Sequence, residues 1–317
     1  MNVLANDGLA AKGREALEKA GFTVHTTRVA QEQLPNFIQE HDIRVLLVRS
    51  ATQVTRDLID ACPKLQLIGR GGVGMDNIDV AHARKKGLQV FNTPRASSDS
   101  VAELVFAHLF GGARFLHESN RNMPLEGDQR FKALKKSYSQ GVELKGKTLG
   151  IIGFGRIGKA VARIGLGIGM RVIYYDKETS RSEVHVSFYN GESIAFELQA
   201  SSLKEVLGNA DFLTLHVPAQ KKTLIGEAEI KLMKPGAALI NTARGGVVDE
   251  IALVEALDSG HLRFAALDVF ASEPSPEVQL LMQPGISMSP HIGAATQEAQ
   301  ERIGEELAEQ IIDFFKD

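Results

Sequence analysis

Short apolar runs alternate with longer amphipathic stretches over the first third of the chain. We expect buried strands at the apolar runs, residues 3–5, 23–25, 45–48, 67–69 and 88–91. We expect helices at the amphipathic stretches, residues 10–20, 31–41, 55–61 and 80–86. This alternation is typical of βαβ units, which place parallel strands in one sheet with helices on its faces.

A second block of the same kind begins after a long helix. Ser100 and Glu103 form a capping-box pattern, which predicts that an apolar helix opens at Ser100 and runs to about residue 119. Residues 121–140 are polar and contain Pro124, so we expect a connecting loop. Strands are then expected at residues 148–152, 171–175, 212–216, 238–241, 264–266 and 286–288. Helices are expected at residues 157–168 and, with apolar positions recurring every four residues, at 296–316.

One segment interrupts this alternation. Residues 184–188 and 193–198 are strand-like and flank Asn190-Gly191. Asn-Gly is a strong hairpin signal, because a type I′ turn needs a positive φ at both central positions. We therefore expect a small antiparallel hairpin over these residues.

A glycine motif of the form G-x-G-x-x-G is made by Gly153, Gly155 and Gly158. The motif follows a predicted strand and opens a predicted helix, and the next strand ends in Asp176. In such a turn the first glycine allows the bend, the second admits a pyrophosphate and the third lets helix and strand pack closely. Asp176 would accept hydrogen bonds from the ribose and repel a 2′-phosphate, which favours NAD over NADP. The alternative is a glycine turn that serves packing alone.

Composition and charge exclude several classes of protein. The 317 residues are 44% hydrophobic and 24% charged, which is ordinary for a globular protein, and the length suggests two domains. The net charge of −3 gives no basic surplus for nucleic acid. The single cysteine, Cys62, rules out an intrachain disulfide. With no apolar run long enough for a bilayer and no signal-peptide pattern, we expect a cytoplasmic protein with no membrane partner.

Three polar residues each follow a predicted strand of the second block: Arg244, Glu273 and His291. Because ligands bind at the carboxyl ends of strands in open α/β sheets, loops can bring all three to one crevice. Histidine suits proton exchange with a hydroxyl, a carboxylate beside it fixes its tautomer, and arginine binds a carboxylate in a planar, bidentate way. Alone, each would be read as a solvated or structural residue; together they predict hydride transfer at a 2-hydroxy acid. We expect no metal.

These motifs resemble the D-isomer-specific 2-hydroxyacid dehydrogenases over essentially the full chain. The segments at residues 48–52, 69–79 and 100–103 carry the resemblance with the glycine loop and the three catalytic contexts, and they favour its phosphoglycerate branch. The resemblance implies two Rossmann-like or flavodoxin-like doubly wound parallel-sheet domains with a cleft between them. Residues 1–98 and 290–317 would form a discontinuous substrate domain, and residues 99–289 the NAD domain.

The resemblance also implies residue roles. Arg244, Glu273 and His291 would be catalytic, while Arg49 and Ser50 would line the substrate pocket and Val73 and Gly74 would offer amides to the substrate carboxylate. The expected NAD contacts are Gly153, Gly155, Arg156, Ile157, Gly158, Asp176, His216, Val217, Pro218, Thr242, Ala243 and Asp268. Asp268 would face the nicotinamide carboxamide. A homodimer through the helix that starts at Ser100 is implied as well.

Three departures from the family pattern bear on these expectations. Ser97 stands where the family often has Asn, the hairpin at residues 184–198 looks longer than the usual link, and the chain ends at Asp317. That end leaves no room for a C-terminal regulatory domain, so serine feedback through one is not expected. The substrate phosphate has two candidate partners, Arg49 and the basic cluster, which consists of Arg130, Lys132, Lys135 and Lys136. A solvated loop is the alternative for that cluster.

The expected function is NAD-dependent oxidation of D-3-phosphoglycerate to 3-phosphonooxypyruvate, at the entry to serine synthesis, with His291 as the general base. Two alternatives stay open. The first is a glyoxylate/hydroxypyruvate reductase or D-lactate dehydrogenase of the same family. The second is an NAD-sensing binding protein of the corepressor type, which would keep the same three residues.

Overall fold

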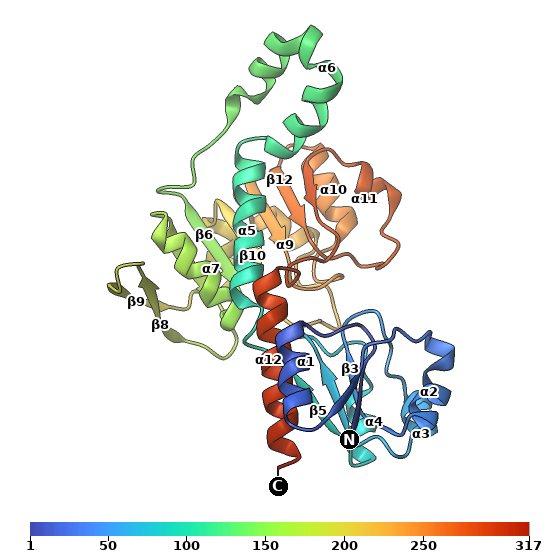
Figure 1. Cartoon of the computed structure of the whole chain (residues 1–317). Helices are drawn as coiled ribbons and strands as arrows, with labels where there is room; N and C mark the ends of the chain where they lie inside the picture. The colour runs from blue at the N-terminus through green and yellow to red at the C-terminus, as the bar shows by residue number, and fades with distance from the viewer. Residues whose placement is uncertain (317) are drawn as a thin grey trace. The chain divides into compact units, whose positions relative to one another are not determined.

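A computed structural model describes residues 1–316, and Asp317, the last residue of the expected substrate domain, lies outside the described residues. The chain divides into two compact units. Unit 1 comprises Met1–Ser100 and Ala294–Asp317, and unit 2 comprises Val101–Gly293. Figure 1 shows the elements of each. Within residues 1–316, no helix combines the length and apolar character needed to cross a membrane.

Unit 1 contains a five-stranded sheet whose strands all run parallel. In spatial order these are β2 (Thr23–His25), β1 (Asn2–Ala5), β3 (Ile43–Val48), β4 (Leu67–Arg70) and β5 (Gln89–Asn92). This is the flavodoxin-like order 2-1-3-4-5, in which the strand order reverses beside the first strand. β3 is apolar almost throughout because a central parallel strand is covered on both faces.

Helices cover both faces of this sheet. They are α1 (Ala11–Lys19), α2 (Leu34–Glu40) with the short 3₁₀ turn η1 (Gln31–Gln33) before it, α3 (Arg56–Ala61), α4 (Val80–Lys85) and α12 (Gln297–Phe314). α1 and α12 come from opposite ends of the chain and lie side by side (Figure 1). Their close approach requires glycine, because a Cβ on Gly13 would lie 2.5 Å from the Gly304 carbonyl oxygen. The second terminal segment thereby completes the core of unit 1.

Unit 2 contains a six-stranded sheet, again parallel throughout. In spatial order its strands are β13 (Ile286–Met288), β12 (Leu262–Leu267), β11 (Ala237–Asn241), β10 (Phe212–Leu215), β6 (Thr148–Ile152) and β7 (Arg171–Tyr175). The strand order reverses beside β6, which places a switch point at the carboxyl ends of β6 and β10. All the strands predicted for the two blocks are confirmed to within a few residues.

Two apolar cores, one on each face, hold this sheet between helices. α8 (Leu203–Asn209), α9 (Glu227–Leu232) and α10 (Glu250–Asp258) supply one core, while α5 (Ser98–Ala113) and α7 (Arg156–Gly167) supply the other. α11 (Val278–Met282) precedes β13. A separate antiparallel hairpin follows β7 and consists of β8 (Arg181–Ser187) and β9 (Ser193–Gln199). The predicted hairpin is therefore confirmed.

One sequence expectation is wrong. Residues 121–140 form not a loop but most of α6 (Leu116–Ser137) and a 3₁₀ turn, η2 (Tyr138–Gln140). The preceding helix also begins at Ser98 rather than Ser100 and ends at Ala113, before Phe115 adopts a left-handed φ of 56°. Strong helix formers sustain α6 despite Pro124, with non-helical dihedrals at Arg130. Among its side chains only Leu134 is buried, so it carries no apolar periodicity to read.

Candidate active site

The glycine turn joins β6 to α7 and has the geometry that its sequence predicts. Gly153 has a φ of 92°, and a Cβ there would lie 2.4 Å from the His216 carbonyl oxygen. A Cβ on Gly158 would lie 2.2 Å from the Gly153 carbonyl oxygen, whereas nothing would meet one on Gly155 within 4 Å. The first and third glycines thus serve close packing, and the second leaves open space in front of the N-terminus of α7. Free amides and a positive dipole end at such a terminus attract phosphate.

Asp176 follows β7 and is held by backbone donors. Its Oδ2 accepts from the Phe154 amide at 2.6 Å, and its Oδ1 accepts from the amides of Glu178 and Thr179 at 2.8 and 2.9 Å. Desolvation is the largest single effect on the pKa of Asp176 and raises it, but these donors together outweigh it and leave the pKa below its usual value. The carboxylate therefore stays charged beside the glycine turn, where it would repel a 2′-phosphate.

Two enclosed polar atoms lie near the switch point. His216 Nδ1 and Thr242 Oγ1, just past β10 and β11, have no hydrogen-bond partner among residues 1–316. His216 Nε2 contacts Thr214 Oγ1 at 3.0 Å, and burial lowers the pKa of His216 to about 3, so its ring is neutral. Because buried polar atoms in proteins are normally paired, these two point to a ligand. With the open space at Gly155, the residues fit a dinucleotide, and Val217, Pro218 and Ala243 continue the same two loops.

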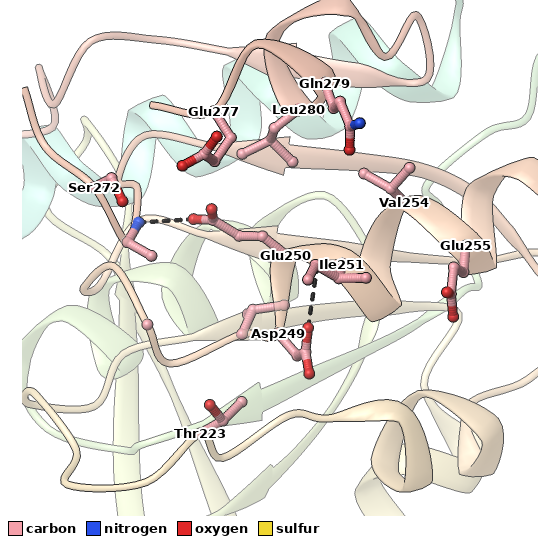
Figure 2. A pocket seen from close by; sticks show the side chains of 13 residues that line it. Thr223, Asp249, Glu250, Ile251, Val254, Glu255, Ser272, Glu277, Gln279 and Leu280 are labelled. Atoms are coloured by element: carbon pink, nitrogen blue, oxygen red, sulfur yellow. Dashed lines mark hydrogen bonds between the residues drawn. The ribbon is translucent and has the colours of Figure 1, made fainter. Parts of the chain in front are cut away.

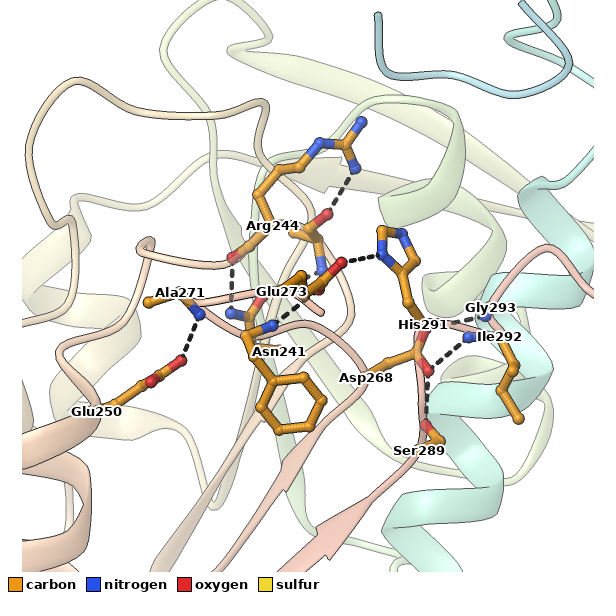
Figure 3. Close-up of polar contacts among 12 residues, drawn as sticks. Asn241, Arg244, Glu250, Asp268, Ala271, Glu273, Ser289, His291, Ile292 and Gly293 are labelled. Atoms are coloured by element: carbon orange, nitrogen blue, oxygen red, sulfur yellow. Dashed lines mark hydrogen bonds and ion pairs between the residues drawn. The ribbon is translucent and has the colours of Figure 1, made fainter. Parts of the chain in front are cut away.

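His291 and Glu273 form a direct pair on the loops after β13 and β12. His291 Nδ1 lies 2.8 Å from Glu273 Oε2, and Glu273 Oε1 accepts from the Phe270 amide at 2.9 Å (Figure 3). About two-fifths of the His291 side chain is exposed. A carboxylate at Nδ1 selects the tautomer that carries its proton there, which leaves Nε2 able to accept one. The pair thus has the geometry of an oriented general base.

Arg244 occupies the loop after β11. Asn241 Nδ2 donates to the Arg244 carbonyl at 2.9 Å, and Asn241 Oδ1 accepts from the Ala243 amide at 3.0 Å, so the strand's last residue fixes the turn. A Cβ on Gly245 would lie 1.8 Å from the Phe270 carbonyl oxygen, which brings this loop against the one that carries Glu273. In Figure 3 the Arg244 and His291 side chains extend toward the same side. The three residues predicted from sequence are therefore brought together.

Asp268 anchors the turn that carries His291. Its side chain is 1% exposed, and Oδ1 accepts from the Ser289 hydroxyl at 2.6 Å and the Ile292 amide at 2.8 Å. Oδ2 accepts from the Gly293 amide at 2.8 Å. His291 lies in the chain between the residues that make these contacts, and it has a left-handed φ of 54°. A non-glycine residue keeps such a conformation only where its surroundings impose it, and this carboxylate supplies three of the bonds that do so.

The predicted substrate residues all belong to unit 1. Asp7 Oδ2 accepts from the Arg49 amide at 2.6 Å, and Asn77 Nδ2 donates to the Arg49 carbonyl at 2.7 Å. Arg49 and Ser50 line a cavity of about 370 Å³ with Asn6, Asp7, Gly8, Thr26, Arg28 and Ala51. Desolvation, partly offset by Asp7, lowers the pKa of Arg49.

Val73 and Gly74 follow β4 in the same unit. The Val73 side chain is 37% exposed, and its carbonyl accepts from Asn92 Nδ2 at 2.7 Å. Among residues 1–316, no backbone carbonyl accepts from the amides of Val73 and Gly74, the two donors that the resemblance assigns to the substrate carboxylate. In the basic cluster, Arg130 pairs with Glu126 four residues earlier on α6. Sequence reasoning missed Asp7, Arg28 and Asn77, because single polar residues in loops give no pattern.

A second cavity of about 680 Å³ is lined in part by Ala271 and Ser272, the two residues that precede Glu273 in the chain (Figure 2). Its acidic lining consists of Asp249, Glu250, Glu255 and Glu277. Glu250 Oε1 accepts from the Ala271 amide at 2.7 Å and so braces the loop that ends in Glu273. Desolvation, with a smaller effect of the neighbouring carboxylates, raises the pKa of Glu250.

This shift predicts a pH-dependent stability. An acid whose pKa is higher when folded stabilises the fold fully below its unfolded pKa, and that contribution is lost as the pH rises through the folded pKa. Glu250→Gln keeps the acceptor for Ala271 but cannot ionise, so it should gain stability relative to wild type as the pH rises from 4 to 8. Melting temperatures across this range measure the difference. Glu255→Gln, at an exposed position in the same cavity, is the control and should show no such trend; a flat difference for Glu250→Gln would contradict the assignment.

Taken together, the parallel sheet, its glycine turn and the basic, acidic and imidazole groups at one sheet edge define a dinucleotide-binding protein of the α/β class. The comparison with known families narrows this class. Residues 106–293 match the NAD binding domain of the D-isomer specific 2-hydroxyacid dehydrogenases. The chain belongs to this family, and its cofactor is NAD.

Individual relatives agree with this placement. A D-3-phosphoglycerate dehydrogenase from Methanocaldococcus jannaschii is 42% identical over 98% of this chain, which spans 57% of that relative's length. A hydroxypyruvate reductase from Thermotoga maritima is 41% identical over 98% of this chain and 96% of its own length. The NAD⁺-bound 3-phosphoglycerate dehydrogenase of Entamoeba histolytica superposes with a TM-score of 0.78 at 29% identity, over 100% of this chain and 95% of that one.

Proposed function

We propose that this protein is an NAD-dependent D-2-hydroxyacid dehydrogenase that interconverts D-3-phosphoglycerate and 3-phosphonooxypyruvate. The observation that carries the reaction type is the His291–Glu273 pair at the carboxyl edge of the unit 2 sheet. The substrate assignment is supported by the relative named for phosphoglycerate and by the arginines of the unit 1 cavity. In this role the protein would act in the cytoplasm at the entry to serine synthesis.

The proposed mechanism assigns one task to each group. His291 Nε2 removes the proton of the C2 hydroxyl in oxidation and returns it in reduction. Glu273 holds the other ring nitrogen and favours the imidazolium that forms. Arg244 binds the substrate carboxylate and the oxygen on C2, where charge develops. Bound NAD supplies the hydride acceptor. The amides of Val73 and Gly74 would bind the carboxylate as well.

NAD would lie along the carboxyl edge of the unit 2 sheet. The glycine turn with Arg156 and Ile157 would hold the pyrophosphate, and Asp176 the ribose. His216, Val217, Pro218, Thr242, Ala243 and Asp268 would complete the cofactor contacts. The unpaired atoms His216 Nδ1 and Thr242 Oγ1 support this placement.

The substrate phosphate is assigned to the cavity that Arg28 and Arg49 line. Two arginines and one carboxylate line that cavity, and the carboxylate, Asp7, already accepts from the Arg49 amide and from both the amide and the hydroxyl of Thr52. The cavity thus keeps an excess of positive charge with planar donors, which suits a phosphate. The Thermotoga relative favours a second candidate, reduction of hydroxypyruvate, a 2-oxo acid that differs from 3-phosphonooxypyruvate by this phosphate alone.

A substrate panel separates the two. With NADH, 3-phosphonooxypyruvate should be reduced with the highest kcat/KM, ahead of hydroxypyruvate, glyoxylate and pyruvate. Arg49→Gln should lower kcat/KM for the phosphorylated acid by roughly tenfold to a hundredfold and leave hydroxypyruvate nearly unchanged, because a charged hydrogen bond to phosphate is lost. Arg56→Gln, at an exposed arginine paired with Asp79, is the matched control. Equal losses for both substrates, or no preference in wild type, would reject the phosphate assignment.

A homodimer is part of the same proposal. Apolar side chains are exposed along α5 and α6 of unit 2, namely Phe110, Leu116, Met123, Leu125 and Phe131. Leu125 is 77% exposed, and exposed apolar side chains on long helices favour burial against a second copy. The basic cluster lies on α6 as well, so it would be close to this dimer interface. No nucleic-acid or membrane partner is proposed.

A further inference from the structure

His108 is a buried histidine of α5 that none of the roles above uses. Its side chain is 6% exposed, on the helix face turned toward the end of the sheet. Nδ1 lies 2.8 Å from the Ser287 hydroxyl oxygen and Nε2 lies 3.0 Å from that of Ser289. Ser287 and Ser289 lie at the carboxyl end of β13, four and two residues before His291. Each ring nitrogen of His108 therefore has one partner next to the catalytic turn.

Counting protons fixes the direction of this chain of hydrogen bonds. Ser289 donates its single hydroxyl proton to Asp268 Oδ1, whose other partners are the amides of Ile292 and Gly293. A carboxylate has no proton to donate, so Asp268 accepts from Ser289 as it does from the two amides. The Ser289 oxygen is then left as an acceptor toward His108. His108 Nε2 must then carry the proton of a neutral ring, and Nδ1 must accept from Ser287.

The ring is also suited to remain neutral. Burial is the main effect on the pKa of His108 and lowers it; His117 adds to this lowering, and Asp268 opposes it. A neutral imidazole with both nitrogens satisfied can sit in an apolar helix face without an uncompensated charge. Val105 and Leu109, which lie near it on α5, belong to a buried apolar core of unit 2.

We propose that His108 is a positioning residue which, through Ser289, orients Asp268, the expected nicotinamide-facing carboxylate, and thereby holds the turn that presents His291. The Nε2–H of His108 determines which way the Ser289 hydroxyl points. Without it, that hydroxyl can rotate away from Asp268, and the left-handed turn at His291 loses one of its ties. The effect reaches the part of the site that would bind the nicotinamide ring, with no contact between His108 and either substrate.

The test is NADH binding, measured by fluorescence titration of the whole chain without any 2-oxo acid. His108→Leu, which preserves bulk but removes the donor, should raise the Kd for NADH about tenfold, the scale of one buried hydrogen bond. Ser289→Ala should raise the Kd by a similar factor. The double variant should have a Kd no higher than either single variant, because both substitutions remove the same hydrogen bond. His108→Gln, which can again donate to Ser289, should restore binding to near the wild-type value.

Two further measurements separate a positioning role of His108 from a purely structural one. Val105→Ala, a buried control on the same helix, should lower Tm by a few degrees and leave the Kd for NADH unchanged. In wild type, long-range ¹H–¹⁵N correlations of the imidazoles should show the proton of His108 on Nε2. A proton on Nδ1, an unchanged Kd in a folded His108→Leu, or an equal rise in Val105→Ala would each overturn the proposal.

This inference rests on NAD binding by unit 2 and not on the identity of the substrate. A chain that binds NADH but reduces no 2-oxo acid would therefore reject the proposed function while the His108 test could still be read.

Discussion

His291→Gln is expected to lower kcat for 2-oxo acid reduction by roughly two to four orders of magnitude, the usual contribution of a general acid–base group. The reason is that glutamine at this position cannot exchange a proton, while the nearest carboxylate, Glu273, is already engaged by the Phe270 amide. The dinucleotide contacts lie on other loops, so the Kd for NADH should stay within about twofold of wild type. Steady-state rates with NADH and fluorescence titration measure the two quantities.

Backbone strain is the main complication of this variant. Since His291 has a φ of 54°, His291→Asn serves as a second variant, because asparagine is tolerated in the left-handed region. His185→Gln, an exposed histidine on β8, is the matched control and should leave kcat unchanged. If both His291 variants turned over substrate at the wild-type rate, His291 would have no part in the chemistry. If the wild type itself bound NADH without turnover, a binding protein of the corepressor type would be favoured instead.

The parts of the fold that the sequence predicted well are those determined by local pattern. Each parallel strand is a short apolar run between polar segments, and its two covered faces leave no ambiguity about burial. The glycine turn is also local, because Gly153 and Gly158 satisfy steric demands within one strand–turn–helix unit. The grouping of Arg244, Glu273 and His291 followed from topology alone, since parallel neighbours end at the same edge.

What could not be predicted depends on tertiary context. The sequence predicts a loop where α6 lies, because Pro124 interrupts the segment and almost none of its side chains is buried. The tie from His108 through Ser289 to Asp268 joins α5 to a loop about 180 residues away in the chain, and no periodicity signals such a contact. The same holds for Asp7 and Asn77, which shape the Arg49 loop from two distant segments.

Arg244→Lys is expected to lower kcat/KM for the 2-oxo acid by roughly a hundredfold to a thousandfold, with the Kd for NADH nearly unchanged. Lysine keeps the charge but loses the planar fork that can hold a carboxylate and the C2 oxygen together. Because the second of these contacts strengthens as charge develops, kcat should fall in addition to the rise in KM. The Asn241 contacts to the loop are made with the backbone, so they survive the change and the loop keeps its shape.

The matched control is Arg263→Lys, at an arginine of β12 whose guanidinium donates to the Gln140 carbonyl at 3.0 Å on an exposed surface. It should change neither kcat nor KM. A rise in KM alone for Arg244→Lys would restrict the guanidinium to ground-state binding, and the role assigned to it in polarising the C2 oxygen would be wrong. A loss confined to kcat would instead place Arg244 at the reacting oxygen and transfer carboxylate recognition to the amides of Val73 and Gly74.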